Sequence, residues 1–198
     1  ASLAGLKARR DFIVALLQVA PDTRQLWVPL GADGTTSTSV DDNARTITWD
    51  ATIAAQFRTV GSGYFVTFDG SADQGSSPDA ALMTFGNGTT DEGFSIYAWL
   101  SLTADANVKV IIARHDLTTG ATNLEWSFHF SALEELVGQV FDDSVGTDVR
   151  VGRQFNTALP TATDMLVVMT YSGSATAAGI KLYAFDGTNA GQVDDTGS

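Results

Sequence analysis

The sequence contains no cysteine, which excludes disulfide bonds, thiolate metal sites and cysteine catalysis within the chain. Basic residues are scarce as well: 11 Lys and Arg stand against 23 Asp and Glu, which gives a net charge of −12. A chain this acidic repels phosphate groups, so we expect neither a nucleic-acid partner nor binding to an anionic membrane surface. The chain has 198 residues, of which 44% are hydrophobic, and this is enough to bury a sizeable core.

Glutamate is also rare, because only four of the 23 acidic residues are Glu, whereas Asp, Thr and Gly are abundant. These three residue types favour turns and strands over helix interiors. Exposed helices usually contain many Glu and Lys residues, so a chain with few of them is expected to have few exposed helices. The composition therefore favours an all-β fold.

Residues 2–20 are the exception, because their apolar residues recur at the spacing of one helix face. Lys7, Arg9 and Arg10 lie off that face, and Pro21 ends the pattern. We therefore predict a short N-terminal helix or arm. Its positive charge on an otherwise acidic chain suggests docking on a neighbouring subunit, and packing on its own domain is the alternative.

A secretion signal is a second interpretation of the same segment. Against it, Asp11 separates the basic residues from the apolar run at 12–20, and no small-residue cleavage site follows. The apolar run is too short to cross a bilayer, so we expect no membrane insertion. We predict an arm over residues 1–24 and one domain over residues 25–198.

The remainder consists of short runs with alternating or apolar character, separated by turn residues such as Asp-Gly and Gly-Asn-Gly. Residues 31–43 are rich in Gly, Ser, Thr and Asp and are expected to form a loop. Many short strands at regular spacing predict an antiparallel β-sandwich or a barrel. The expected strands are 25–30, 45–49, 64–68, 82–85, 94–102, 108–114, 124–130, 135–141, 149–153, 165–171 and 180–185.

Four of these segments carry landmarks in a fixed order. They are Tyr64-Phe65-Val66-Thr67-Phe68-Asp69-Gly70 with Asp73 after it, Phe94-Ser95-Ile96-Tyr97-Ala98-Trp99-Leu100, Val110-Ile111-Ile112-Ala113-Arg114 with the strand at 125–130, and Leu166-Val167-Val168-Met169-Thr170-Tyr171 with Ile180-Lys181-Leu182-Tyr183. This set, over residues 64–187, resembles the laminin-G-like, concanavalin A-like jelly-roll superfamily. The resemblance implies a jelly-roll β-sandwich with a non-catalytic binding or structural role.

The chain departs from that family at two places. Asp164-Met165 stand where the family often has Trp-His. The family usually closes with further strands after the Leu-Tyr hairpin, whereas this sequence ends at Ser198. We expect either that N-terminal strands take their place or that the sequence is part of a longer product.

Enzymatic activity is not expected from the acidic residues. Glycoside hydrolysis needs two carboxyl groups that flank the scissile bond, and glucanases of this class place Glu, Asp and Glu at alternating positions of one strand. No such run is present, and Glu134 and Glu135 are adjacent, so on a strand they would face opposite ways. A glycoside hydrolase that uses Glu125 or Glu135 is kept as an alternative.

Serine and zinc chemistry have no support in the sequence either. There is no Gly-x-Ser-x-Gly elbow, and His115 and His129 lack metal-ligand spacing. His129 alternates with Phe128 and Phe130, so we expect it to lie on a sheet face.

Calcium is the ion that the residue types favour, because it binds carboxylate and carbonyl oxygens of loops. Asp69 and Asp73 are the predicted ligands, and no other cofactor is expected. The alternative is that these residues only form turns, which is the ordinary role of Asp in loops. Further aspartates that fit either role are Asp79, Asp142, Asp143 and Asp148.

Sugar binding would use exposed aromatic rings, but the four tryptophans lie in alternating strands, where burial is the commoner outcome. They are Trp27, Trp49, Trp99 and Trp126. No ligand-binding residue is assigned from the sequence.

These observations together predict a non-catalytic structural protein at the surface of a virion, as a capsid decoration or tail protein. The arm would bind other subunits of the assembly, and the sandwich would face outward, with binding to cell-surface glycans as an added role. The alternative is a secreted, lectin-like carbohydrate-binding module that depends on calcium. The expected location is the virion surface or the extracellular space.

Overall fold

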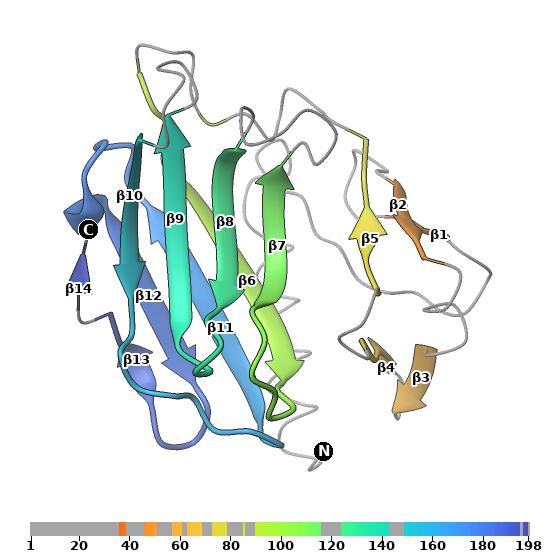
Figure 1. Ribbon diagram of the computed structural model, residues 1–198. Coiled ribbons are helices and arrows are strands. Elements are labelled where there is room, and N and C mark those ends of the chain that lie inside the picture. Colours follow the sequence, from red (N-terminus) through yellow and green to blue (C-terminus); the bar gives the residue numbers. More distant parts are fainter. Residues whose placement is uncertain are drawn as a thin grey trace. The chain divides into compact units, whose positions relative to one another are not determined.

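The computed structural model divides the chain into two compact units, Ala1–Asp79 and Ala80–Ser198 (Figure 1). The predicted helix over 2–20, the boundary at residue 24 and the strand over 25–30 lie outside the described residues. Apart from the 3-10 turn η5 (Ala177–Gly179), the elements of the described part are all strands, which confirms the all-β prediction. The structure describes residues 36–38, 46–50, 57–60, 63–68, 73–78, 85, 90–115, 124–142, 149–194 and 196–197.

The first unit contains two small antiparallel sheets. One consists of β1 (Thr36–Thr38), β2 (Thr46–Trp49) and β5 (Gly75–Ser76), and the other is the hairpin of β3 (Phe57–Val60) and β4 (Gly63–Val66). Trp49 is opposite Gly75, where a Cβ would lie 2.5 Å from the indole ring. Strand β1 falls in the predicted loop, because a Thr-Ser-Thr strand has no apolar residue to reveal it.

The second unit contains two larger antiparallel sheets. Strand order is β13-β12-β11-β6 in one sheet and β14-β10-β9-β8-β7 in the other. Figure 1 shows β7 to β10 as a layer lying over β6, β11 and β12. The strands are β6 (Phe94–Ser101), β7 (Lys109–His115), β8 (Leu124–Phe130), β9 (Leu136–Asp142), β10 (Val149–Gln154), β11 (Asp164–Tyr171), β12 (Ile180–Phe185), β13 (Ala190–Gln192) and β14 (Thr196–Gly197).

The seven longer strands of this unit, β6 to β12, begin and end within one residue of their predicted limits. The β-sandwich is therefore confirmed, whereas the jelly-roll connectivity stays a prediction. Strands β13 and β14 were not predicted, because their two or three residues carry no apolar alternation. Their extended form follows from pairing with β12 and β10, which no local pattern shows.

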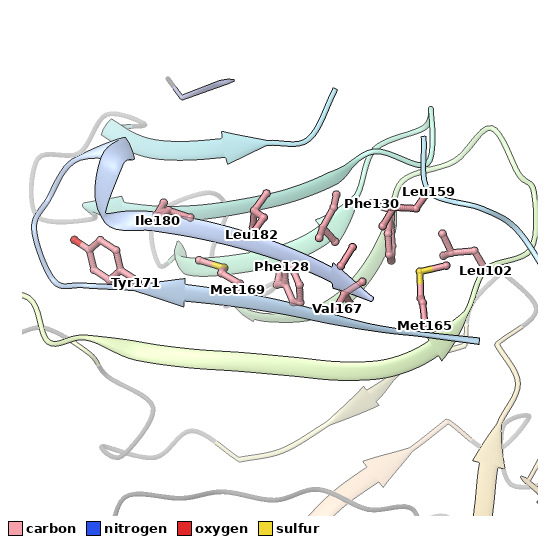
Figure 2. Packing of buried hydrophobic residues seen from close by; sticks show 12 residues of the cluster. Leu102, Phe128, Phe130, Leu159, Met165, Val167, Met169, Tyr171, Ile180 and Leu182 are labelled. Carbon is pink, nitrogen blue, oxygen red and sulfur yellow. The ribbon is translucent and has the colours of Figure 1, made fainter. Parts of the chain in front are cut away.

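The core lies between the two sheets of this unit, and both sheets contribute to it. Phe128 and Phe130 of β8 are at most 1% exposed, and Met169 and Leu182 of the facing sheet are fully buried. Figure 2 shows these side chains in the space between the sheets. The apolar residues of β6 pack against this cluster: Phe94, Ile96, Ala98 and Leu100.

Tyr171 is the last residue of β11, and its side chain is buried. Its hydroxyl donates to Asp91 Oδ2 at 2.5 Å and accepts from the Ala175 N–H at 2.9 Å. Burial and the hydrogen bond to Asp91 together raise the pKa of Tyr171 to about 12. The bond to Ala175 helps to hold that residue in the left-handed conformation, with φ at 51°.

A buried ion pair connects the two sheets at another edge. Arg153 of β10 places Nη2 2.5 Å from Oδ2 of Asp194, which follows β13 and whose side chain is fully buried. The other carboxylate oxygen of Asp194 accepts from the Leu182 N–H of β12 at 3.0 Å. Because Arg153 belongs to one sheet and Leu182 to the other, Asp194 fastens the C-terminal segment to both.

The two sheets pack closely against each other at Gly138 of β9. A Cβ at this position would lie 2.9 Å from Met169 Sδ and 3.0 Å from a methyl carbon of Leu182. Both partners are fully buried, so they have little room to move.

We expect Gly138→Ala to lower the free energy of unfolding by about 1–3 kcal/mol, because the added methyl group overpacks the contact. Urea denaturation followed by tryptophan fluorescence measures the change. Gly191→Ala on β13 is the matched control, since nothing lies within 4 Å of a Cβ there, and it should change stability by about 0.5 kcal/mol or less. Equal stability of the two variants would show that the sheets can separate at Gly138 without cost.

Candidate functional site

The outer face of the five-stranded sheet carries a row of polar side chains. Core residues Phe128 and Gly138 fix the inward direction, so their strand neighbours Ser127 and Gln139 face outward. Ser127 is opposite Gln139 across the β8–β9 ladder. Gln139 is opposite Gly152 across the β9–β10 ladder. Three central strands of the sheet therefore meet in one polar surface.

His129 belongs to the same surface, two residues along β8 from Ser127. Its Nδ1 lies 3.3 Å from Ser127 Oγ, and that hydroxyl also lies 3.5 Å from Gln139 Oε1. The sequence predicted His129 as a sheet-face residue, and the structure confirms this. We define Ser127, His129, Gln139 and Arg150 as the polar cluster.

Arg150 of β10 is the exposed cation of the polar cluster. It is opposite Phe141 and two residues from Gly152 on the same face. Its side chain makes no ion pair or hydrogen bond with any residue of the described part. Among the described residues this arginine stands out, because acids outnumber bases in the chain by about two to one.

Burial lowers the pKa of His129 below its ordinary value of 6.5, and the positive charge of Arg150 lowers it further. His129 is therefore neutral at pH 7, with one ring nitrogen as donor and the other as acceptor. The cluster then combines a fixed cation, a neutral imidazole, a hydroxyl and an amide. This combination suits hydrogen bonding to a polar ligand.

The glutamates near this sheet all take part in local contacts. Glu125 forms an ion pair with Arg114. Glu134 accepts from the Lys109 ammonium and from the Asp105 N–H. Glu135 accepts from Ser131 Oγ at 3.1 Å and from Gln154 Nε2 at 2.7 Å. The expectation for adjacent strand residues does not apply to Glu134, because it lies in the turn before β9 with φ at 59°.

The described structure does not show the predicted calcium ligands, Asp69 and Asp73, next to each other. Asp69 lies outside the described residues, and Asp73 is half-buried just before β5 and already has an interaction partner. Within the described ranges, no three His, Asp or Glu side chains are close enough to hold a metal ion. A calcium site at Asp69 and Asp73 stays a prediction.

Asp186 shows the turn role of aspartate directly. Burial alone would raise the pKa of its carboxyl, but hydrogen bonds from the Asn189 side chain and from the N–H groups of Asn189 and Thr188 outweigh burial and lower it. These bonds are 2.7–2.8 Å long and close the turn between β12 and β13.

Of the three tryptophans in the described residues, Trp126 is buried, at 4% exposure. It packs with Phe85 and Phe94, with ring centroids 6.1 and 5.9 Å away. Trp49 and Trp99 are half-buried, and Trp27 lies outside the described residues. The expectation of burial is confirmed for Trp126.

The polar cluster is not visible in the sequence as a site, because its members come from three strands. Ser127 and His129 share one strand, but Gln139 and Arg150 join them only through the ladders of the sheet.

Comparisons with protein-family models, curated proteins and solved structures gave no match. No helix in the described part is long and apolar enough to cross a membrane.

We expect the lowered pKa of His129 to make stability depend on pH. The unfolded chain takes up a proton near pH 6.5 and the folded chain only at lower pH, so unfolding becomes easier as the pH falls below about 6.5. His129→Gln should remove this contribution. The free energy of unfolding, measured from pH 7.5 to 5 for both proteins, should fall more steeply for the wild type. Parallel curves would show that His129 titrates normally in the folded protein.

Proposed function

We propose that this protein is a non-catalytic binding and structural module whose β-sandwich presents the polar cluster to a ligand. The observation that carries the proposal is the position of that cluster on the outer face of a sheet whose inner face is tightly packed. Such a face presents hydrogen-bonding groups from three neighbouring strands, which suits an extended polar ligand such as a glycan.

The state of the glutamates favours binding over hydrolysis. A glycosidase needs one carboxyl group as a proton donor and another as nucleophile or base. Glu125 is neutralised by Arg114, and Glu135 is held by Ser131 and Gln154. Both residues therefore have structural roles in the sheet that would compete with catalysis.

Placement at the surface of a virion or a similar assembly is the finer part of the proposal. It is supported by the sequence, in which a segment with Lys7, Arg9 and Arg10 precedes a strongly acidic remainder. Opposite charges attract neighbouring copies at low ionic strength. In this arrangement the arm attaches the protein and the sandwich faces outward.

A secreted carbohydrate-binding module is the second candidate. The polar cluster serves it equally well, and calcium bound at Asp69 and Asp73 would add chelator sensitivity. Glycan binding that is lost with a chelator, in a protein that stays monomeric at every salt concentration, would favour this candidate over the assembly protein.

The role of the arm is tested by the variant Lys7→Gln/Arg9→Gln/Arg10→Gln in the full chain. We expect the wild type to form oligomers at low salt and the variant to remain monomeric, because the charge attraction is removed. Light scattering after size exclusion measures the mass, and near-UV circular dichroism should show that the sandwich is unchanged. Identical masses of the wild type and the variant would contradict the docking role.

The non-catalytic role is tested separately with β-glucans as substrates. Turnover of β-glucans that disappears in Glu125→Gln or Glu135→Gln would contradict it.

A further inference from the structure

We propose that the outer face of the four-stranded sheet is the surface that receives the N-terminal arm of a neighbouring copy. This inference rests on the docking role proposed above for the arm and names the surface to which the arm binds. The polar cluster lies on the other sheet, so glycan binding and arm docking would use different faces of the sandwich.

The outer face of this sheet is apolar, although its inner face already forms part of the core. Met165, Val167 and Met169 of β11 point into the core, so the residues between them face outward. The same alternation along β6 and β12 directs further large side chains outward. We define the apolar face by its six residues, which are Tyr97, Trp99, Leu166, Val168, Tyr183 and Phe185.

These six residues form two adjacent rows across three strands. In each row the aliphatic residue of β11 lies between an aromatic residue of β6 and one of β12. The first row is Tyr97, Val168 and Tyr183, and the second row is Trp99, Leu166 and Phe185. Neighbouring rows on one face of a sheet are about 7 Å apart, so the two rows form one continuous surface.

The exposed part of the apolar face is largest on β12. Phe185 is 42% exposed, and Tyr183 and Val168 are half-buried. Leu166 is only 9% exposed, and the two residues of β6 already have interaction partners. The arm is therefore placed against β11 and β12.

The sequence of β11 also indicates that its outer side is covered in the assembled protein. Residues 165–169 are apolar at every position, whereas a strand with one face in water alternates between apolar and polar residues. A continuous apolar run of this kind is typical of a strand that is covered on both faces. Contiguous apolar surface that is left exposed on a folded domain marks an interaction site.

The arm has the chemistry and the length that fit the apolar face. Its apolar residues recur at helical spacing over residues 2–20, and a helix packed on a sheet face is a common arrangement of two layers. A helix of this length spans about 28 Å, which is enough to cross a four-stranded sheet about 15 Å wide. The apolar side of the arm would cover Tyr183 and Phe185 while its cations stay in water.

The charges at the two ends of the apolar face favour one placement of the arm. Asp164 is exposed on the same side of β11, two residues before Leu166. Lys181 is exposed at the opposite end, where it pairs with Thr170 across the β11–β12 ladder. The three cations of the arm are therefore attracted to the end with Asp164 and repelled from the end with Lys181.

The variant Tyr183→Gln/Phe185→Gln tests the apolar face in the full chain. We expect the dissociation constant of the oligomer at low salt, measured by analytical ultracentrifugation, to rise by about tenfold or more, because two aromatic contacts are lost. Both side chains point away from the core, so urea denaturation should still show one cooperative transition. Val110→Gln/Leu133→Gln is the matched control, because it removes two apolar side chains that are 64% and 66% exposed elsewhere, and it should leave association unchanged.

Charge reversal tests where the cations of the arm lie. Asp164→Arg should weaken association at low salt, because it places a positive charge beside them. Adding Arg9→Glu/Arg10→Glu to the same chain should restore association. Glu92→Arg is the matched control, because it reverses an exposed charge outside the apolar face, and the same changes in the arm should bring no recovery there. Equal recovery of both variants would contradict the placement at Asp164.

Disulfide cross-linking distinguishes docking between copies from packing within one chain. The sequence contains no cysteine, so introduced thiols have only each other as partners. Copies with Leu17→Cys are mixed with longer, tagged copies that carry Phe185→Cys, and a second mixture with Val110→Cys is the control. We expect a mixed disulfide dimer in the first mixture and none in the second.

The outcomes separate this inference from the docking role on which it rests. Oligomers that tolerate Tyr183→Gln/Phe185→Gln would overturn the inference and leave the docking role of the arm intact. A wild type that is monomeric at low salt would overturn both. An internal disulfide in Leu17→Cys/Phe185→Cys, without a mixed dimer, would also overturn both, because the arm would then pack on its own sandwich.

Discussion

The close contact between Gly138 and the pair Met169 and Leu182 is the constraint on which the sandwich depends. A hydrogen atom in place of a side chain on β9 lets two large residues of the facing sheet fill the space against it. Phe128 and Phe130 can then be buried completely on the neighbouring strand. Each fully buried side chain of this kind stabilises the fold by about 1.5–3 kcal/mol. The ion pair of Arg153 with Asp194 fastens the same two sheets at an edge.

This packing also determines what the outer face can do. Side chains alternate between the two faces of a strand. Because β8 and β9 direct Phe128 and Gly138 toward the core, they must present Ser127, His129 and Gln139 on the outer face. The sheet holds these groups in register through β8, β9 and β10. A binding site on such a rigid surface loses little entropy when a ligand is bound. The acidic residues nearby form ion pairs and hydrogen bonds within the sheet and the turn before β9.

The sequence predicted the longer strands well, because their apolar residues alternate or run together. In β6 and β8, Phe94 and Phe128 stand at alternate positions with other apolar residues, and these residues face the core. The short strands β1, β3, β5, β13 and β14 were not predicted, because their form comes from pairing more than from a pattern in their own residues. The same limit hid the polar cluster, because its residues come from β8, β9 and β10 and share one face of the sheet only through the ladders.

Native-state hydrogen exchange tests most directly whether the two sheets form one unit around Gly138. The account predicts that slowly exchanging amides of β8, β9, β11 and β12 share one opening free energy, equal to that of global unfolding. Added denaturant should lower all of them with the same slope. If one sheet exchanged at a much lower free energy while the other stayed protected, the contact across Gly138 would not be the interaction that holds the sandwich together.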